Sequence, residues 1–270
     1  MSASLRVLTF NLWVGAELER RLVHVISAIA ALRPDAVLLQ EVRSGPSLRN
    51  TAEQIAAGLG WSGVAFASQM PADRAELQGV AIIAPAPLHS VYTTPLPHKE
   101  GILTYVMLSA RLTHSGRQIA LHTTHLRWRP VDSKLRSDQA RAVLSVMQAY
   151  GGDVQIVGGD FNAAPQTQEI GVFRNRLFDS FGTRHPDTPG ITWARRNPNT
   201  GPIATKHGLK RDRRIDYLFV GPSAVMRNCV LDCDVVLDQP LQESGKPLWL
   251  SDHFGLLARF DLPDTRPVVA

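Results

Sequence analysis

The 270-residue sequence contains only two cysteines and no internal repeat. On one extended strand, the Cα atoms of Cys229 and Cys233 would lie about 13 Å apart, beyond the roughly 7 Å that a disulfide can bridge. Two thiols also supply too few ligands for a zinc site. We therefore expect free thiols and a reducing, cytoplasmic compartment.

Long apolar runs are missing as well. No stretch approaches the roughly 18 uninterrupted apolar residues of a membrane span. The first residues lack the features of a secretory signal, because Arg6 and Asn11 fall within the first expected strand and no small-residue cleavage site follows. Neither an integral membrane protein nor a secreted precursor is expected.

The sequence does contain 44% hydrophobic residues, a globular proportion, and an excess of basic residues that gives a net charge of +5. The length suits one large α/β domain or two small ones. We predict a single domain over residues 1–270, because the candidate site residues are spread along the whole chain. The positive charge favours anionic partners, but it does not distinguish nucleic acid from other phosphates.

A polar segment follows an apolar strand pattern at residues 156–162, which read Ile-Val-Gly-Gly-Asp-Phe-Asn. Residues i and i+2 of an extended segment share a face, so Asp160 and Asn162 are predicted to aim at one point past a strand at 154–157. Gly158 and Gly159 permit close approaches that a Cβ would prevent. The pair suits a site that holds a metal ion or a water against a phosphate, although these are also ordinary turn residues.

Five further polar segments end or interrupt apolar runs. They carry Asn11, Glu41, His125, Asp216 and the pair Asp252–His253. Taken singly, each of them also fits a solvated strand end or a surface turn. As an ordered set, they indicate that distant parts of the chain converge on one site.

Hydrophobic periodicity predicts the elements that carry these segments. Helices are expected at 17–32, 48–59, 133–150 and 167–177. Strands are expected at 5–12, 35–40, 64–67, 79–84, 103–112, 118–124, 154–157, 191–194, 214–220, 225–237 and 254–260, with 64–67 and 79–84 in a second sheet.

In order and spacing, the polar segments resemble the endonuclease/exonuclease/phosphatase superfamily, in its deoxyribonuclease I-like and neutral sphingomyelinase-like branch. The resemblance runs from Asn11 to His253. It implies an α/β fold, a four-layer α/β/β/α sandwich of two mixed β-sheets. It also implies a hydrolase of the nuclease, phosphodiesterase or phosphatase type.

The resemblance makes Glu41 the main ligand of Mg²⁺ or Mn²⁺, with Asn11 beside it and Asp252 completing the shell. Oxygen donors without thiolates suit these hard cations. It pairs Asp216 with His253 as catalytic residues that either contact the scissile phosphate or act as acid or base. A carboxylate bonded to an imidazole fixes the tautomer and favours the protonated ring.

The remaining roles concern water and phosphate. The resemblance implies that Asp160 orients the attacking water and that Asn162 donates to a phosphate oxygen. His125 matches a phosphate-contacting histidine, and Glu76 stands where a glutamate supports that histidine. His122 should face the other way and serve the structure.

Two groups of basic residues, at 127–141 and 195–214, lie close to these segments in the sequence. Arginines and indole rings in loops can neutralise phosphates and stack on bases. Arg127, Trp128, Trp193 and Arg214 are therefore predicted to bind substrate. Ordinary solvated charge with two packing tryptophans is the alternative.

The sequence thus predicts a divalent-metal-dependent phosphoesterase that cleaves phosphodiester bonds by in-line attack of water, with nucleic acid as the leading substrate class. The second hypothesis is a phosphodiesterase or phosphatase acting on a lipid headgroup, an inositol phosphate or another small ester. A third is a non-hydrolytic binding module or a repurposed scaffold, against which the completeness of the acidic, amide and imidazole set argues.

Overall fold

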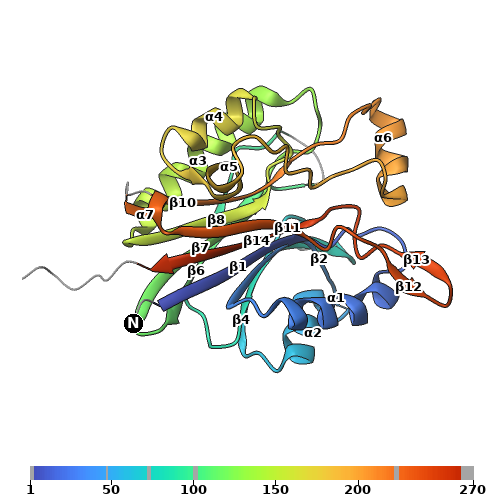
Figure 1. The fold of residues 1–270 in the computed structure, drawn as a ribbon, viewed down its shortest axis with the longest axis horizontal. Helices are drawn as coiled ribbons and strands as arrows, with labels where there is room; N and C mark the ends of the chain where they lie inside the picture. Colours follow the sequence, from blue (N-terminus) through green and yellow to red (C-terminus); the bar gives the residue numbers. More distant parts are fainter. Residues whose placement is uncertain (1–2, 47, 72–73, 100–102, 222–224, 263–270) are drawn as a thin grey trace, which may run out of the picture.

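Two six-stranded mixed β-sheets lie face to face at the centre of the molecule (Figure 1). The computed structural model describes residues 3–46, 48–71, 74–99, 103–221 and 225–262. The first sheet contains β1 (Ala3–Asn11), β2 (Ala36–Ser44), β3 (Gly63–Ser68), β4 (Leu77–Ala84), β11 (Val230–Val236) and β14 (Gly255–Leu262). The second contains β5 (His89–Pro95), β6 (Val106–His114), β7 (Arg117–His125), β8 (Val154–Asp160), β9 (Phe178–Asp179) and β10 (Asp216–Gly221). Their strand orders are β11-β14-β1-β2-β4-β3 and β5-β6-β7-β8-β10-β9.

Helices cover the outer face of each sheet (Figure 1). They include α1 (Leu18–Leu32) and α2 (Thr51–Leu59) on the first sheet, and α3 (Ser133–Tyr150) and α4 (Gln168–Arg174) on the second. The short helices are α5 (Ser180–Arg184), α6 (Gly201–His207) and α7 (Val225–Asn228), and a 3₁₀ turn, η1, covers Pro198–Thr200. The resulting α/β/β/α sandwich confirms the predicted fold class.

Alternation along the strands separates the core into layers. In β1, Leu8 and Phe10 pack toward α1 and α2, whereas Leu5 and Val7 pack against the second sheet. All four side chains are fully buried, and each contributes about 1.5–3 kcal/mol by leaving water. A slip of one residue in strand register would exchange the two faces, so the pattern fixes the register and thereby the position of each strand end.

Several predicted strands differ from the structure. The strands at 64–67 and 79–84 do form, as β3 and β4, but they belong to the first sheet, because β4 pairs antiparallel with the edge of β2. Residues 191–194 form no strand and make only one bridge, from Trp193 to Arg213. The range 225–237 begins with a turn of helix, and its strand starts at Val230.

Neither cysteine forms a disulfide, and both are buried. Cys233 lies within β11, while Cys229 precedes it. Among the described residues, no helix combines the length and the hydropathy that a membrane crossing requires.

His122 is structural, as predicted. Its ring is fully buried, with Nδ1 2.8 Å from Ser109 Oγ and Nε2 3.3 Å from Gln155 Oε1. Burial lowers the pKa of His122 from 6.5 to about 3, so the ring is neutral in the folded protein at physiological pH.

This burial predicts an acid-dependent loss of stability. As the pH falls below about 6.5, the unfolded chain binds a proton that folded His122 does not, so the free energy of unfolding should fall by about 2 kcal/mol by about pH 5. His122→Gln should lack this loss, and urea unfolding at about pH 7.5 and about pH 5 measures it. The exposed histidine His89 gives the control, His89→Gln. An acid loss of equal size in His122→Gln and wild type would contradict the assignment.

Candidate active site

The polar segments meet at one end of the two sheets. Parallel β1 and β2 bring Asn11 and Glu41 to the same edge. In the second sheet, Asp160 pairs with His125 on β7 and with Asp216 on β10. Figure 1 shows α6 and the small hairpin β12 (Leu241–Glu243) and β13 (Lys246–Leu248) at this end of the molecule.

The sequence predicted that the second strand ends at Glu41, but β2 continues beyond it to Ser44. Glu41 sits in a bulge of β2, where the register shifts between Gln40 and Val42 and the backbone of Glu41 adopts φ 55°. A bulge leaves one residue unpaired and re-aims its side chain. Here the Glu41 carboxylate accepts a 2.9 Å hydrogen bond from the Val14 amide, in the loop after β1.

The segment at 158–162 combines both predicted interpretations, a strand and a turn. β8 continues through the glycines to Asp160, and at Gly159, with φ 153°, a Cβ would lie 1.9 Å from the Thr124 carbonyl oxygen. Asn162 then turns the chain with φ 51°, and its amide donates to Asp160 Oδ1 at 2.8 Å. The two side chains therefore do not share an extended face, and the Asn162 side chain donates to the Leu126 carbonyl at 3.1 Å.

His253 lies among three buried carboxylates. Its Nδ1 is 2.9 Å from Asp216 Oδ2, while Nε2 is 3.6 Å from Asp160 Oδ2 and 3.9 Å from Asp252 Oδ1. The same oxygen of Asp160 lies 3.5 Å from His125 Nε2. These five residues are each at most 6% exposed, so their charges interact with little screening by solvent.

Burial and neighbouring charge set the protonation of this cluster. Burial opposes a charged imidazole, but the carboxylates of Asp216, Asp252 and Asp160 outweigh it and hold the pKa of His253 well above 6.5. Burial raises the pKa of Asp252 to about 7. Repulsion from Glu41 and Asp160 adds to this increase, and attraction to His253 opposes it. A protonated His253 can donate from Nε2 while Nδ1 stays bonded to Asp216.

The donor set fits a hard divalent cation. Glu41, Asp252 and Asp160 repel one another electrostatically, and Asn11 Nδ2 lies 3.2 Å from Asp160 and 3.5 Å from Glu41. Carboxylate and amide oxygens are the ligands that Mg²⁺ and Mn²⁺ prefer. Ligand atoms of Asp160, Asp216 and His253 also lie within 4.8 Å of one another. Two sets of side chains could therefore hold a cation, Glu41 with Asp252 and Asn11, or Asp160 with Asp216 and a neutral His253.

Three positioning residues escaped the sequence prediction. Thr192 Oγ1 donates to Asp216 Oδ2 at 2.6 Å, and its carbonyl accepts from the Phe254 amide at 2.7 Å. Ser251 Oγ donates to the Asn11 carbonyl at 2.7 Å and accepts from the His253 amide at 3.1 Å. Both residues tie separate strands and loops of the site together.

Arg21 is the third. It is 1% exposed, and its guanidinium donates to the carbonyls of Leu12, Trp13, Ala16 and Leu250. Burial lowers the pKa of Arg21 to about 10, so it stays charged and faces the negative site. The sequence held a signal for it, because Arg21 interrupts the apolar stripe formed by Leu18, Leu22, Val25 and Ile29.

The cluster opens into a cleft of about 340 Å³. Its lining contains most of the predicted site residues, namely Glu41, Asp160, Asn162, His125, Asp252 and His253. Two residues that the sequence predicted to bind substrate, Trp128 and Trp193, also line it. Trp193 is only 3% exposed, and its side chain lies close enough to the Asp252 carboxylate to lower the pKa of that group. Residues of α6 and Arg213 complete the wall.

Two predicted substrate contacts lie elsewhere. The Arg214 guanidinium is buried against Asp179, with nitrogen–oxygen distances of 2.8 and 2.9 Å, so it braces β10 and cannot meet substrate in the cleft. The Arg127 side chain bonds Asp132 at 2.7 Å and does not line the cleft. Basic residues that follow a motif in sequence need not share its face.

Glu76 also fails to support His125. It is exposed and lies 3.7 Å from Arg43, while Nδ1 of His125 is buried without a hydrogen-bond partner in the described part of the chain. The prediction for Glu76 relied on its position in the sequence. In the structure Glu76 lies in the loop before β4 and is not part of the cleft lining.

Recessed carboxylate, amide and imidazole groups thus meet at one edge of an α/β/β/α sandwich. The chain belongs to the Endonuclease/Exonuclease/phosphatase family, whose model matches residues 8–253. Members of this family are generally phosphoesterases and nucleases, and they typically depend on a divalent metal. A search of curated proteins gave no match.

Solved structures agree with this fold. Humanized D. rerio TDP2 superposes with a TM-score of 0.74 at 19% identity, covering 96% of this chain and 99% of that one. The human Nocturnin catalytic domain with bound sulfate gives 0.72 at 23%, covering 96% and 93%. A family protein from Leptotrichia buccalis C-1013-b gives 0.71 at 17%, covering 96% and 100%. At these identities the likeness concerns the fold alone.

The crowding of these carboxylates predicts how Mn²⁺ and the loss of one charge change thermal stability. In EDTA, Asp252→Asn should melt no lower than wild type, because a neutral amide removes repulsion from Glu41 and Asp160. Mn²⁺ at about 100 times its dissociation constant should stabilise the wild type by about 2.7 kcal/mol, and this gain should largely vanish in the variant. Thermal unfolding with and without Mn²⁺ measures both effects.

The matched control is Asp153→Asn, an exposed aspartate just before β8, at the opposite end of that strand from Asp160. It should respond to Mn²⁺ as the wild type does. Equal Mn²⁺ stabilisation of Asp252→Asn and Asp153→Asn would remove Asp252 from the cation site.

Proposed function

We propose that this chain is a divalent-metal-dependent phosphoesterase that hydrolyses phosphodiester bonds, with nucleic acid as its leading substrate class. The observation that carries the proposal is His253, held between Asp216 and Asp160 in a cleft that Glu41 and Asp252 also line. A phosphate in this cleft meets an imidazolium, a carboxylate base and an oxygen-rich cation site together.

Asp160 orients the attacking water and takes its proton. Its two oxygens already accept hydrogen bonds, from the Asn162 amide at 2.8 Å and from Asn11 Nδ2 at 3.2 Å, so the carboxylate is fixed before substrate arrives. His253 donates from Nε2 to a phosphate or leaving oxygen, while Asp216 holds its Nδ1. His125 and the second amide proton of Asn162 stabilise the remaining phosphate oxygens.

Glu41, Asp252 and Asn11 hold the cation in this proposal. Bound Mg²⁺ or Mn²⁺ supplies a Lewis acid that offsets charge developing on the phosphoryl group. The bulge at Glu41 and the hydrogen bond from the Val14 amide fix one ligand, and the side chain of Trp193 lies beside another, Asp252.

Nucleic acid is favoured over other esters by the net charge of +5 and by indole and basic side chains in the cleft wall. A lipid headgroup, an inositol phosphate or another small ester is the second candidate, because the cleft volume is small. A non-hydrolytic module is disfavoured, because every predicted acidic, amide and imidazole group except Glu76 is present at the site. A cytoplasmic location is part of the proposal.

Turnover tests the proposed acid and base. Asp160→Ala and His253→Ala should each lower metal-dependent kcat by at least about two orders of magnitude, the scale for a positioned acid or base. The assay uses Mg²⁺, Mn²⁺ or EDTA with plasmid, single-stranded DNA, RNA, sphingomyelin, inositol phosphates and bis(p-nitrophenyl) phosphate. Exposed His89→Ala is the control and should retain full activity. Unchanged rates in both site variants would refute these roles.

Metal titration tests Glu41. Glu41→Gln keeps the shape of the side chain but removes its charge, so it should raise the Mn²⁺ concentration needed for half-maximal rate by at least about tenfold. A titration curve identical to that of the wild type would exclude Glu41 from the cation site. Binding of DNA without turnover in any metal would indicate a module.

A further inference from the structure

The chain makes a long excursion over the site between residues 194 and 212, and α6 lies within it. Reciprocal hydrogen bonds between Trp193 and Arg213 close its base, with both N···O distances 2.9 Å. Asn197, which is fully buried, donates from Nδ2 to the Ser251 carbonyl at 2.8 Å, next to Asp252. The excursion is therefore closed at its base and held through Asn197 to the loop at residues 251–253.

α6 forms one wall of the cleft, and Trp128 belongs to the facing segment. Ile203, Lys206 and His207 line the cleft from α6. The rings of His207 and Trp128 meet edge to face, with centroids 4.8 Å apart and an interplanar angle of 73°. This contact bridges α6 and the segment after β7, and so forms a roof over part of the cleft.

The reacting groups lie deep beneath this roof. Asp160, Asp252 and His253 are 2%, 5% and 6% exposed. A phosphate must therefore enter a space of about 340 Å³ to reach them. That space suits one phosphate and one ring, and the Trp128–His207 contact joins two of its walls.

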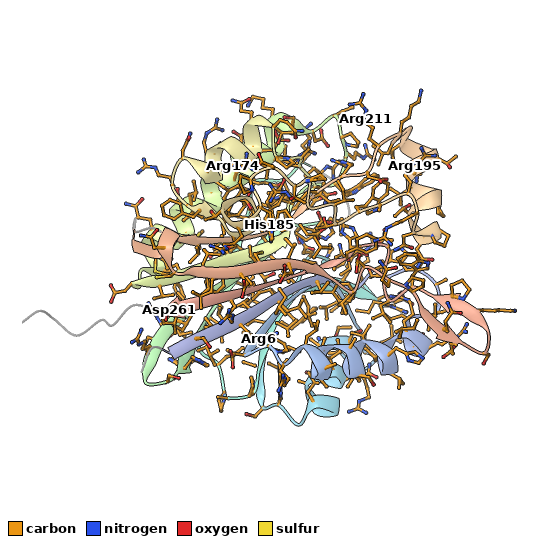
Figure 2. All side chains as sticks on the ribbon, viewed as in Figure 1. Arg6, Arg174, His185, Arg195, Arg211 and Asp261 are labelled. Carbon is orange, nitrogen blue, oxygen red and sulfur yellow. The ribbon has the colours of Figure 1, made fainter. Side chains whose placement is uncertain are left out.

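Exposed basic side chains, which we call the basic rim, lie on the two segments that form these walls, and one of them, Lys206, is part of the cleft lining itself. Arg129, Arg195, Lys206, Lys210 and Arg211 are all exposed. None of them forms an ion pair within the described ranges. Figure 2 shows Arg195 and Arg211 at the end of the molecule that carries α6. Cations without an acidic partner beside an aromatic wall can follow a phosphate backbone while a base stacks on an aromatic ring.

We propose that α6 and Trp128 form a specificity element that admits single-stranded nucleic acid, stacks one unpaired base on Trp128 and excludes duplex. The proposal rests on the phosphoesterase function above and names its substrate class. Trp128 and His207 act as specificity-determining residues, and the basic rim holds the phosphates that flank the scissile one.

The test compares a short oligothymidylate, its duplex with oligoadenylate, and an abasic strand that keeps the phosphates without bases. With Mn²⁺, the wild type should turn over the single strand with a kcat/KM at least about tenfold above those of the duplex and the abasic strand. Trp128→Ala should raise the KM for oligothymidylate by about tenfold and should no longer distinguish it from the abasic strand. Tyr92→Ala, an exposed aromatic on β5, is the matched control and should behave as the wild type does.

The possible failures are distinguishable. Absence of metal-dependent turnover of bis(p-nitrophenyl) phosphate would defeat the phosphoesterase proposal itself. Turnover of that ester, together with equal rates on single strand and duplex, or with equal rates on normal and abasic strands, would overturn only the specificity element. Hydrolysis confined to sphingomyelin or inositol phosphates would overturn it as well.

A second variant guards against misfolding of Trp128→Ala. His207→Ala opens the roof without removing the indole, so it should raise the relative rate on duplex at least about threefold.

Replacing Lys206, Lys210 and Arg211 by alanine should reduce the slope of log Kd against log salt for oligothymidylate, measured in EDTA, by about 0.7 for each phosphate that the variant no longer neutralises. A duplex rate unchanged in His207→Ala and an unchanged slope in the rim variant would each contradict the proposal.

Discussion

Buried negative charge around one imidazole is the constraint on which the rest of this structure depends. Asp216, Asp160 and Asp252 all lie within 4 Å of the His253 ring nitrogens, and Glu41 adds its charge to Asp252. Such crowding is unfavourable unless cations offset it. His253 supplies one, buried Arg21 lies behind the site, and a bound divalent ion would complete the balance.

The fold keeps this arrangement rigid by using strand ends and bridging hydroxyls. Adjacent strands fix the spacing of His125, Asp160 and Asp216, because they are paired in register. Thr192 and Ser251 lie outside the sheets, and their hydroxyl groups bind Asp216 and the Asn11 carbonyl at the strand ends. Preorganised charge of this kind stabilises a transition state without reorganisation during the reaction. α6 and Trp128 add the part of the site that chooses the substrate.

Much of this could be predicted from the sequence. Apolar periodicity predicted the principal helices and strands. The α/β/β/α fold and the shared site of Glu41, Asp160, Asp216 and His253 followed from the resemblance of the ordered polar segments to a known superfamily. Periodicity could not reveal the bulge at Glu41 or the position of β3 and β4, because both depend on which strand edge is available for pairing. Arg214 and Arg127 were misassigned because their partners Asp179 and Asp132 become neighbours only after folding. α6 carries no apolar stripe, and none of its residues is buried, so its role could be recognised only in three dimensions.

The central claim of the proposal is that a divalent cation binds at Glu41, Asp252 and Asn11, beside the Asp160–His253 pair. Anomalous diffraction from a crystal soaked in Mn²⁺ tests this most directly. The account predicts one strong peak with carboxylate oxygens of Glu41 and Asp252 about 2.1 Å away and with His253 outside the coordination shell. A peak coordinated by His253 and Asp216 in place of Glu41, or a cleft without manganese beside an ordered ion elsewhere, would contradict it.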